Sequence, residues 1–388
     1  MSDDKKLKVV HMITTAGSMN LMKGQLNYLV KSGHDVTVVT SPGKGLYEAA
    51  RRENVKIKEI NMARTINPIK DLISLIKIIY FFLIVKPDVC NAGTPKAGLL
   101  GMIAAKLTNV PFRVYTNRGT PFEGSQGIKK RILITTEKIA CLCADKVICI
   151  SPSIKEILIR HNITTNKKTV VFGIGSSNGL QLEKYKYTNE IENKINQIKN
   201  NYDLEKYNFI LGSVGRLNNF KGTKETVLAF ERLQKKYKNI CLILVGVKEK
   251  KDAISKEIND KIVNNPDIIE IGKVKDPIPY YYLMDVLSFP TYREGFGNVS
   301  IEAQATGTPV ITTNATGSIN TILHNETGIL IEIQDVESLE NAIKKCIENP
   351  QLVKKMGSNG KEWVMENFDS KLIWGSLNEL YKDNILTK

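Results

Sequence analysis

The residues best suited to chemistry are two glutamates eight positions apart, Glu294 and Glu302, in the stretch EGFGNVSIE. Gly295 and Gly297 follow the first glutamate, and glycines let backbone N–H groups approach a ligand closely. A helical pattern begins at Asn298, and a helix N-terminus favours an anion. Because a carboxylate repels phosphate, we expect the two glutamates to accept hydrogen bonds from hydroxyl groups. Together these residues predict a ligand with central phosphates and hydroxyl-rich ends, such as a nucleotide-sugar.

Regular elements must surround this turn. The apolar run at residues 285–290 predicts a buried strand that ends where the turn begins. Gly307 ends the predicted helix and Pro309 prevents its continuation, while residues 310–311 begin another strand. The stretch 290–312 therefore predicts strand, glycine-rich turn, helix and strand.

Two cations five positions apart, Arg216 and Lys221, follow another predicted strand at residues 209–214. When a nucleotide-sugar loses its sugar, charge builds on the leaving phosphate and must be neutralised. A divalent metal on acidic ligands can do this, but the chain contains no Asp-x-Asp. Arginine offers a planar fork and lysine a point charge for the same task.

The stretches EGFGNVSIEAQATGTPVI and GRLNNFKG resemble the signatures of the retaining GT-B glycosyltransferases of family 4. The resemblance implies an α/β fold of two Rossmann-like domains facing across a cleft, and catalysis without a metal or another cofactor. The alternatives are a plain βαβ turn with two solvated glutamates and an ordinary basic loop at a strand end.

The resemblance also implies roles for single residues. Arg216 and Lys221 would bind the diphosphate, Glu294 the hydroxyls of the donor sugar, and Glu302 the ribose. The other donor-binding candidates are Gly17, Val274, Gly295, Phe296, Gly297, Asn298 and Val299, with Val299 acting only through its backbone N–H. For Gly17 a phosphate loop and a simple turn stay equally open, because only one glycine is present.

The loop after the predicted strand at residues 112–116 departs from the pattern of many family members. It reads TNRG, so Arg118 stands where those members carry histidine. VYTNRGTPFEG and TPKAGLLGMIAAKL resemble the bacterial capsule and surface-polysaccharide subgroup, in which arginine is usual. Arginine cannot act as a general base, so the resemblance implies that Arg118 binds a diphosphate or a sugar. Glu123 is the candidate for deprotonating or orienting the acceptor, and Lys96 for a second anion; both are equally compatible with solvated loop charges.

Strands that alternate with helices predict two doubly wound parallel sheets. We expect an acceptor-binding domain at residues 1–175 and a nucleotide-sugar-binding domain at 208–366. The polar stretch 176–207 is the expected linker, and FGIGSSNGLQLEKY at residues 172–185, which spans its start, resembles the linker of the family. Residues 367–388 predict a C-terminal helix that is a candidate to pack back on the first domain.

Composition narrows the choice of partners. Lys+Arg of 55 against Asp+Glu of 40 gives a formal net charge of +15, which favours acidic partners. The chain has no run of five basic residues and no zinc-finger or RNA-binding motif, so diphosphates and an anionic membrane surface are expected rather than nucleic acid. The apolar segment 72–85 is too short to span a bilayer and contains Lys77, which predicts a buried or interfacial helix.

The remaining signals are consistent with a cytoplasmic protein. The N-terminus lacks the apolar core of a signal peptide. The six cysteines are spaced for no metal site and indicate small buried residues in a reducing compartment. The four histidines form no cluster, and His11 is expected in the core.

Charge and the apolar segment predict a peripheral enzyme at the inner face of the membrane. The resemblance to the capsule and surface-polysaccharide subgroup implies that it would transfer a sugar, an N-acetylated one being a candidate, from a UDP-sugar to a polyprenyl-diphosphate-linked acceptor, with retention of configuration. One alternative is a transferase with a soluble acceptor, in which segment 72–85 is core. Another is a catalytically silent nucleotide-sugar-binding subunit, which would not hydrolyse the donor. A PLP-dependent phosphorylase shares the fold, but the chain is short and has no convincing lysine context for PLP.

Overall fold

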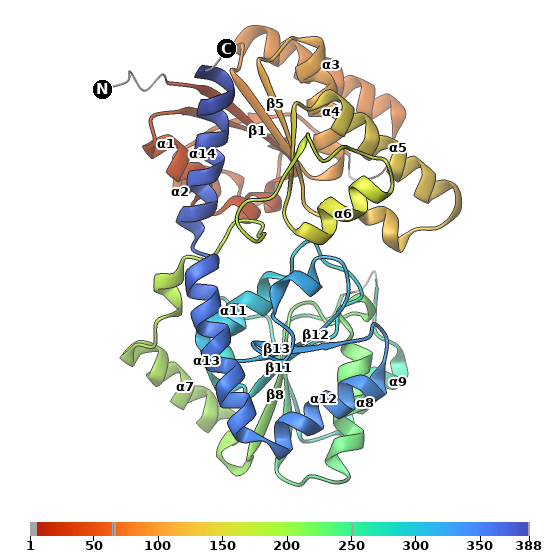
Figure 1. The fold of residues 1–388 in the computed structure, drawn as a ribbon, viewed down its shortest axis with the longest axis vertical. Coiled ribbons are helices and arrows are strands. Elements are labelled where there is room, and N and C mark those ends of the chain that lie inside the picture. The colour runs from red at the N-terminus through yellow and green to blue at the C-terminus, as the bar shows by residue number, and fades with distance from the viewer. Residues whose placement is uncertain (1–5, 64, 66, 250–251, 387–388) are drawn as a thin grey trace. The chain divides into compact units, whose positions relative to one another are not determined.

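The computed structural model describes residues 6–63, 65, 67–249 and 252–386, and for 386 the backbone alone. The chain forms two compact units. Unit 1 contains the described residues up to Gly179 and those from Ser370 onward, and unit 2 contains Leu180–Asp369. Each unit is a parallel sheet with helices packed on it (Figure 1). The two Rossmann-like domains expected from the alternation of strands and helices are confirmed.

The sheet of unit 1 has the order β3-β2-β1-β4-β5-β6-β7, and its paired strands are parallel. Its strands are β1 Lys8–Thr15, β2 Asp35–Ser41, β3 Lys56–Glu59, β4 Val89–Gly93, β5 Phe112–Asn117, β6 Lys146–Cys149 and β7 Thr169–Val170. The central strand β1 pairs on both sides, with Val9 opposite Val36 in β2 and Val89 in β4. The strand order reverses between β1 and β4, which is where parallel sheets of this kind bind ligands, outside the carboxyl ends.

The helices of unit 1 are η1 Ala16–Met22, α1 Gln25–Lys31, α2 Leu46–Glu53, α3 Pro68–Val85, α4 Pro95–Leu107, η2 Pro121–Gly124, α5 Gly127–Cys143, α6 Pro152–Arg160 and α14 Ser370–Leu386. Helix α1 begins at Gln25, directly after Gly24, whose left-handed φ of 86° separates it from η1. The C-terminal helix α14 packs beside α1 (Figure 1), and its Tyr381 is fully buried in the core of unit 1.

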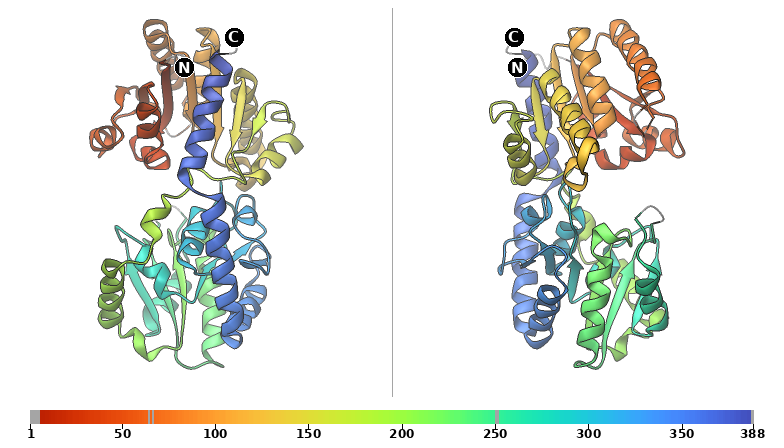
Figure 2. Two further views of the ribbon diagram at one scale, coloured as in Figure 1. Left: turned by 60° about the vertical axis from the view of Figure 1, so that its left-hand side comes forward. Right: turned by 90° about the vertical axis from the view of Figure 1, so that its right-hand side faces the viewer.

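On one side of this sheet α4 packs against β1, β4 and β5, and it is flanked by α3 and α5 (Figure 2). Glycine and alanine positions of α4 allow the close approach: a side chain at Gly98 would overlap the ring of Tyr115. Within the described residues, no helix combines the length and hydropathy needed to cross a bilayer.

The sheet of unit 2 has the order β10-β9-β8-β11-β12-β13, again parallel. Its strands are β8 Phe209–Val214, β9 Ile240–Val245, β10 Ile268–Gly272, β11 Val286–Phe289, β12 Val310–Thr313 and β13 Gly328–Ile331. Leu211 of β8 lies opposite Leu242 on one side and Val286 on the other. The order reverses between β8 and β11, so the turns that follow these two strands are the expected ligand position of unit 2.

The helices of unit 2 are η3 Leu182–Tyr185, α7 Asn189–Tyr202, η4 Leu204–Lys206, η5 Asn219–Lys221, α8 Thr223–Gln234, α9 Lys256–Asn264, α10 Ile278–Leu283, α11 Asn298–Thr306, η6 Ser318–Thr321, α12 Val336–Glu348 and α13 Pro350–Asn367. Helix α7 lies inside the stretch 176–207 that the sequence assigned to a linker. Its Ile191, Ile195 and Ile198 are one helical turn apart and join the core of unit 2, where α7 contacts α10. The chain passes between the units only after Gly179 and after Asp369.

Candidate functional site

Two turns of unit 2 meet at the point where its sheet order reverses. The turn after β8 contains Arg216–Gly222, and the turn after β11 contains Pro290–Gly297. They come into direct contact at Gly222, whose φ is 70° and whose Cβ position would lie 2.2 Å from the carbonyl oxygen of Pro290. Only glycine fits this contact, because any side chain would overlap the backbone of the second turn.

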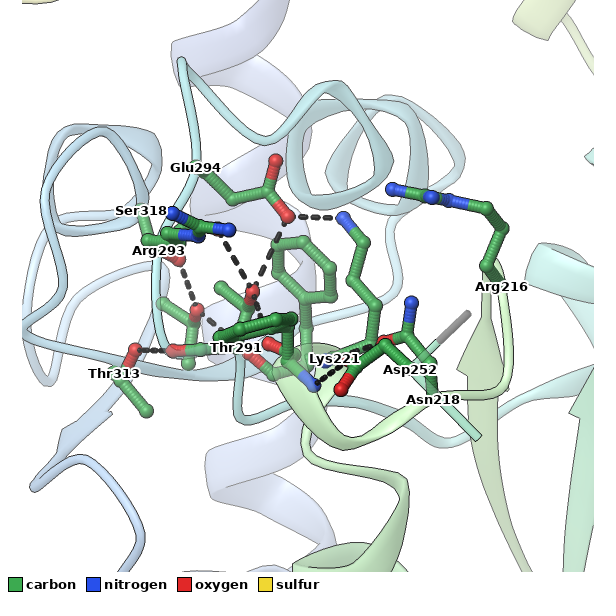
Figure 3. Close-up of polar contacts among 12 residues, drawn as sticks. Arg216, Asn218, Lys221, Asp252, Thr291, Arg293, Glu294, Thr313 and Ser318 are labelled. Atoms are coloured by element: carbon green, nitrogen blue, oxygen red, sulfur yellow. Dashed lines mark hydrogen bonds and ion pairs between the residues drawn. The ribbon is translucent and has the colours of Figure 1, made fainter. Parts of the chain in front are cut away.

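The first turn holds Lys221 in place through its own backbone. Asn218 caps η5: its Oδ1 accepts a hydrogen bond from the Lys221 N–H at 2.9 Å, and its own N–H donates to Thr223 Oγ1 at 3.1 Å. The Lys221 ammonium forms an ion pair with Glu294 from the second turn and lies 5.1 Å from the ring centre of Phe289 (Figure 3). The sequence-predicted residues Lys221 and Glu294 are therefore direct neighbours.

Arg216 extends its guanidinium toward the same space as the ammonium of Lys221 (Figure 3). Its Nη1 donates to both carboxylate oxygens of Glu249, at 2.7 and 2.8 Å, and Asn218 Nδ2 donates to Glu249 Oε2 at 2.6 Å. Sequence reasoning missed Glu249. It follows β9, which neighbours β8, so the rule that parallel strands end at one edge was the signal for it.

The second turn is fixed around Glu294. The Glu294 N–H donates to the carbonyl of Thr316 at 3.0 Å, and the hydroxyl of Thr291 lies 3.2 Å from Glu294 Oε1. Gly317, with φ 78°, packs so closely that a Cβ there would lie 2.6 Å from the carbonyl oxygen of Glu294. The carboxylate is thus held beside Lys221, and the backbone behind it is closely packed.

Helix α11 begins directly after this turn, with Gly297 at a φ of 90°. The side-chain Oδ1 of Asn298 is buried and has no hydrogen-bond partner among the described residues. Phe296 is buried against Phe368, with 5.5 Å between ring centres, so only its backbone is available to a ligand. A buried carbonyl oxygen without a donor suits a ligand that brings hydroxyl groups.

Glu302, one turn further along α11, accepts a hydrogen bond from the hydroxyl of the buried Tyr281 at 2.9 Å. Burial raises the pKa of Glu302, and the hydrogen bond from Tyr281 opposes that rise. Val274, in the loop after β10, is half-buried against the core of unit 2. The donor-binding residues predicted at the ends of β8, β10 and β11 all lie in this unit; Gly17 does not.

In unit 1, Arg118 follows β5 and is half-buried. Its Nη1 donates to the carbonyl of Ser177 at 3.2 Å and to the hydroxyl of the same residue. Its Nε is buried without a partner, and among the described residues no carboxylate forms an ion pair with it. Burial lowers the pKa of Arg118 to about 10, so it stays cationic at neutral pH. The neighbouring His11 is buried, as expected, and burial together with Arg118 lowers its pKa to about 3.

The other predicted residues of unit 1 are not gathered at Arg118 by any contact. The Lys96 ammonium lies 2.5 Å from Asp71 Oδ2 and donates to the Thr65 carbonyl at 2.9 Å, so its charge is already balanced. Glu123 is exposed and accepts a hydrogen bond from Thr120. Gly17 is exposed in η1, with open space around its Cα.

The arrangement in unit 2 can hold a diphosphate between a guanidinium and an ammonium, with carboxylates available for hydroxyls on either side. Across the described ranges, no group of three or more His, Cys, Asp or Glu side chains is placed to bind a metal ion. Five of the six cysteines are buried and Cys143 is half-buried, and all are free thiols.

Two models of known protein families match this chain. The model of the family described as glycosyl transferases group 1 matches residues 168–363, half of the chain. The chain belongs to this family. A second model, described as glycosyltransferase family 4, matches residues 19–173 of the same glycosyltransferase. The resemblance inferred from EGFGNVSIE and GRLNNFKG is confirmed.

Two relatives of this glycosyltransferase match most of its length. It is 41% identical over 378 residues to the capsular polysaccharide biosynthesis glycosyltransferase CapM of Staphylococcus aureus, covering 97% of each chain. It is 27% identical over 338 residues to the UDP-Gal:alpha-D-GlcNAc-diphosphoundecaprenol alpha-1,3-galactosyltransferase of Escherichia coli, covering 84% of this chain and 83% of that one.

Solved structures show the same fold. A glycosyltransferase from Rickettsia africae superposes with a TM-score of 0.81 at 21% identity, over 99% of this chain and 100% of that one. Anabaena HepE in complex with UDP superposes with a TM-score of 0.80 at 19% identity, over 97% and 100%. The glycosyltransferase therefore has the GT-B architecture of two Rossmann-like domains.

Proposed function

We propose that this glycosyltransferase moves a sugar from a UDP-sugar to a polyprenyl-diphosphate-linked acceptor in capsular or surface polysaccharide synthesis, with retention of configuration. The observation that carries the donor side is the meeting of Arg216, Lys221 and Glu294 at the carboxyl ends of β8 and β11. The relatives support the acceptor side, since one acts in capsule biosynthesis and another is named for a diphosphoundecaprenol acceptor.

In this proposal the bond between the anomeric carbon and the β-phosphate oxygen breaks, and an acceptor hydroxyl oxygen bonds to that carbon as the hydroxyl proton passes to the departing β-phosphate. The electron pair leaves with UDP, so negative charge grows on the β-phosphate. Arg216 and Lys221 neutralise that charge. Removing a single donor from such a site lowers the rate on the order of 10²-fold. Glu294 receives the hydroxyls of the donor sugar and Glu302 those of the ribose. No metal has a role, because two fixed cations already face the leaving group.

On the acceptor side, Arg118 is the proposed ligand of the acceptor diphosphate. It is a half-buried cation without a carboxylate partner among the described residues, and its Nε has no hydrogen bond to give up. Lys96 is a weaker candidate for a second anion, since the anion would have to displace Asp71. Glu123 is the proposed residue that orients the acceptor hydroxyl.

The surface of α3 supports contact with a membrane. Seven large apolar side chains on this helix are each 49% to 74% exposed: Ile69, Leu72, Ile73, Ile76, Tyr80, Leu83 and Ile84. With about 100° of rotation per residue, they fall within an arc of about 120°, and the buried Ser74, Ile78 and Phe82 lie on the opposite side. An apolar stripe of this width on a helix that does not span is typical of a helix lying in a membrane interface.

Helix α5, on the other side of α4, repeats the pattern. Its exposed Ile128, Ile132, Ile139 and Leu142 follow one face. Basic residues flank both stripes: Lys70, Lys77, Lys86, Lys129, Arg131 and Lys138. Cations beside an apolar surface are attracted to anionic headgroups by roughly 1 kcal/mol each. We therefore propose that unit 1 rests on the inner face of the cytoplasmic membrane through α3 and α5, with the acceptor lipid in that bilayer.

The activity is tested by a two-step experiment. Nucleotide-sugars are first screened for thermal stabilisation, because a ligand bound only by the folded protein raises its apparent stability. The best donor is then incubated with undecaprenyl-diphosphate-linked GlcNAc in vesicles, and product is measured with and without EDTA. We expect transfer with net retention at the anomeric carbon and no loss with EDTA. Loss with EDTA that Mg²⁺ or Mn²⁺ restores contradicts the metal-free proposal, and donor binding without transfer or hydrolysis indicates a silent subunit.

A further inference from the structure

Glu137 of α5 is a buried carboxylate that the proposed chemistry does not use. It is 4% exposed, and no ion pair reaches it within the described part of the chain. It lies on the face of α5 opposite the exposed stripe. A carboxylate buried without a cation is costly unless hydrogen bonds satisfy it. Glu137 receives two on the same oxygen, Oε2: one from the hydroxyl of Tyr115 at 2.7 Å and one from Asn117 Nδ2 at 3.0 Å.

Asn117 connects this carboxylate to the turn that carries Arg118. The side chain of Asn117 is fully buried, and its Oδ1 accepts a hydrogen bond from the Gly119 N–H at 3.0 Å. Gly119 has a φ of 148°, a conformation that favours glycine. The amide of Asn117 therefore spans Arg118, with Glu137 on one end and the backbone of Gly119 on the other.

We propose that Glu137 is a positioning residue for the acceptor site, acting through Asn117 to hold the Arg118–Gly119 turn in place. Without the carboxylate, the Asn117 amide would lose the acceptor that fixes its orientation, and its contact with Gly119 would loosen. Arg118 would then be free to leave its position beside Gly93. The two residues lie so close that a Cβ added to Gly93 would be 3.2 Å from the Arg118 Nε. This inference rests on the proposed role of Arg118 in binding the acceptor.

The position of Glu137 also makes the turn sensitive to pH. Burial raises the pKa of Glu137 to about 7, and the hydrogen bonds from Tyr115 and Asn117 oppose that rise. Burial raises the thiol pKa of Cys141 and Cys149, and the charge of Glu137 adds to that rise, so both thiols stay neutral. Lys168 and Lys155 act on those thiols and form no ion pair with Glu137. An ionised carboxylate accepts hydrogen bonds more strongly than a neutral one, so the turn tightens as pH rises through 7.

The direct test measures the turn itself. Hydrogen exchange of the peptide covering residues 115–124 is followed by mass spectrometry at pH 6 and pH 8 and expressed as protection factors. In the wild type we expect several-fold higher protection at pH 8. Glu137→Gln keeps an oxygen acceptor for Tyr115 and Asn117 but cannot ionise, so its protection should be the same at both pH values. Asn117→Ala should lower protection about tenfold without changing UDP binding.

Asp145→Asn is the matched control. Asp145 pairs with Arg113 at the other end of β5, at 2.5 Å, so this variant loses a carboxylate bonded to the same strand. It should keep the wild-type pH dependence of protection at residues 115–124. Equal protection at pH 6 and pH 8 in the wild type, or an unchanged pH dependence in Glu137→Gln, would overturn the inference.

A second arm separates the inference from the proposed function. With undecaprenyl-diphosphate-linked GlcNAc as acceptor, Glu137→Gln should abolish the change of acceptor kcat/KM around pH 7 and leave the donor KM within about twofold. If the exchange results hold but no variant, including the wild type, transfers sugar, the proposed function fails and the positioning role stands. If transfer occurs with the same pH profile in both proteins, the positioning role fails.

Discussion

At the residue scale, both cations of the proposed diphosphate site face carboxylates: Lys221 faces Glu294, and Arg216 faces Glu249. A bound diphosphate has to compete with these partners for the two cations. The contacts differ in their surroundings, because Lys221 and Glu294 are mostly buried while the side chain of Arg216 is 59% exposed. The two pairs should therefore respond differently to substitution.

Glu294→Gln should separate transfer from nucleotide binding. The substitution removes the charge that receives the donor sugar and frees the Lys221 ammonium for phosphate. We expect sugar transfer to fall on the order of 10²-fold, while the Kd of UDP, which has no sugar, stays the same or decreases.

Glu302→Ala should instead weaken the binding of UDP itself. Arg216→Ala and Lys221→Ala should weaken UDP binding and lower kcat/KM. Calorimetry with UDP and initial rates with the donor measure the two effects; equal, strong loss of UDP affinity in Glu294→Gln and Glu302→Ala contradicts this division of roles.

Glu249→Gln should strengthen UDP binding at low ionic strength. Arg216 would no longer be neutralised by its partner, and an exposed ion pair of this kind contributes up to about 1 kcal/mol. We therefore expect up to about a fivefold lower Kd of UDP, a difference that shrinks as salt screens the charges. Titrations with UDP in 20 mM and 500 mM NaCl test this. A higher Kd in the variant would mean that Glu249 serves chiefly to orient Arg216.

At the element scale, α3 and α5 leave apolar stripes uncovered by any described part of unit 1. The sequence pattern of segment 72–85 is compatible with a buried helix, but Ser74, Ile78 and Phe82 are its only buried residues. The reason lies in packing: α4 occupies the sheet surface between the two helices, so α3 meets the unit along a single face. Most of the apolar surface of α3 is thus left uncovered by unit 1 and could contact a membrane.

Replacing Ile76, Tyr80 and Leu83 with serine should reduce binding to anionic vesicles more than tenfold. Each half-exposed apolar side chain contributes roughly 1 kcal/mol on burial, and the loss should be visible in flotation with vesicles containing phosphatidylglycerol. Neutralising Lys129, Lys130 and Arg131 should lower the same binding in a salt-dependent manner.

The matched control is Val263→Ser with Ile333→Ser, two exposed apolar positions of unit 2, which should leave vesicle binding unchanged. UDP binding should be unaffected in all of these variants. Unchanged flotation of both unit 1 variants, with equal turnover of a short soluble acceptor and a polyprenyl one, contradicts the membrane proposal.

At the scale of the whole molecule, the buried carboxyl of Glu137 makes the stability of the fold depend on pH. The pKa of Glu137 is raised from 4.5 to about 7 in the folded protein. Between these values the folded chain holds a proton that the unfolded chain has released, so the free energy of unfolding falls as pH rises through this window. Above pH 7 both states are ionised and this contribution stays lost.

The free energy of unfolding of Glu137→Gln, relative to that of the wild type, should therefore be higher at pH 8 than at pH 4. The pKa difference corresponds to roughly 3 kcal/mol across the window, which is the upper limit for the change in ΔΔG between the two pH values. Urea unfolding of unit 1, followed at both pH values in the wild type and the variant, measures it. A ΔΔG that is the same at pH 4 and pH 8 would show that Glu137 titrates normally.

Local patterns specified most of the elements and two residues of the proposed donor site that lie in contact. The predicted strand at 209–214 agrees residue for residue with β8, and the helix at α11 begins at Asn298 and ends before Gly307, as glycine chemistry dictates. Lys221 and Glu294 were assigned to one ligand from sequence and are in contact in the structure. Turn glycines and apolar periodicity are local signals, so they can be recognised in a single sequence.

Partners that come from distant segments were decided only by the tertiary structure. Glu249 contacts Arg216 because β9 lies beside β8, and Asp71 neutralises Lys96 because α3 packs on α4. The spacing of these residues in the sequence predicts neither contact. Glu137 looks like one more polar residue of an amphipathic helix, and only its burial beneath β5 turns it into a support for Asn117. The sequence determined which residues can do chemistry because residue type and local geometry are encoded together. Which of their charges are balanced, buried or available depends on neighbours that only the folded sheet brings together.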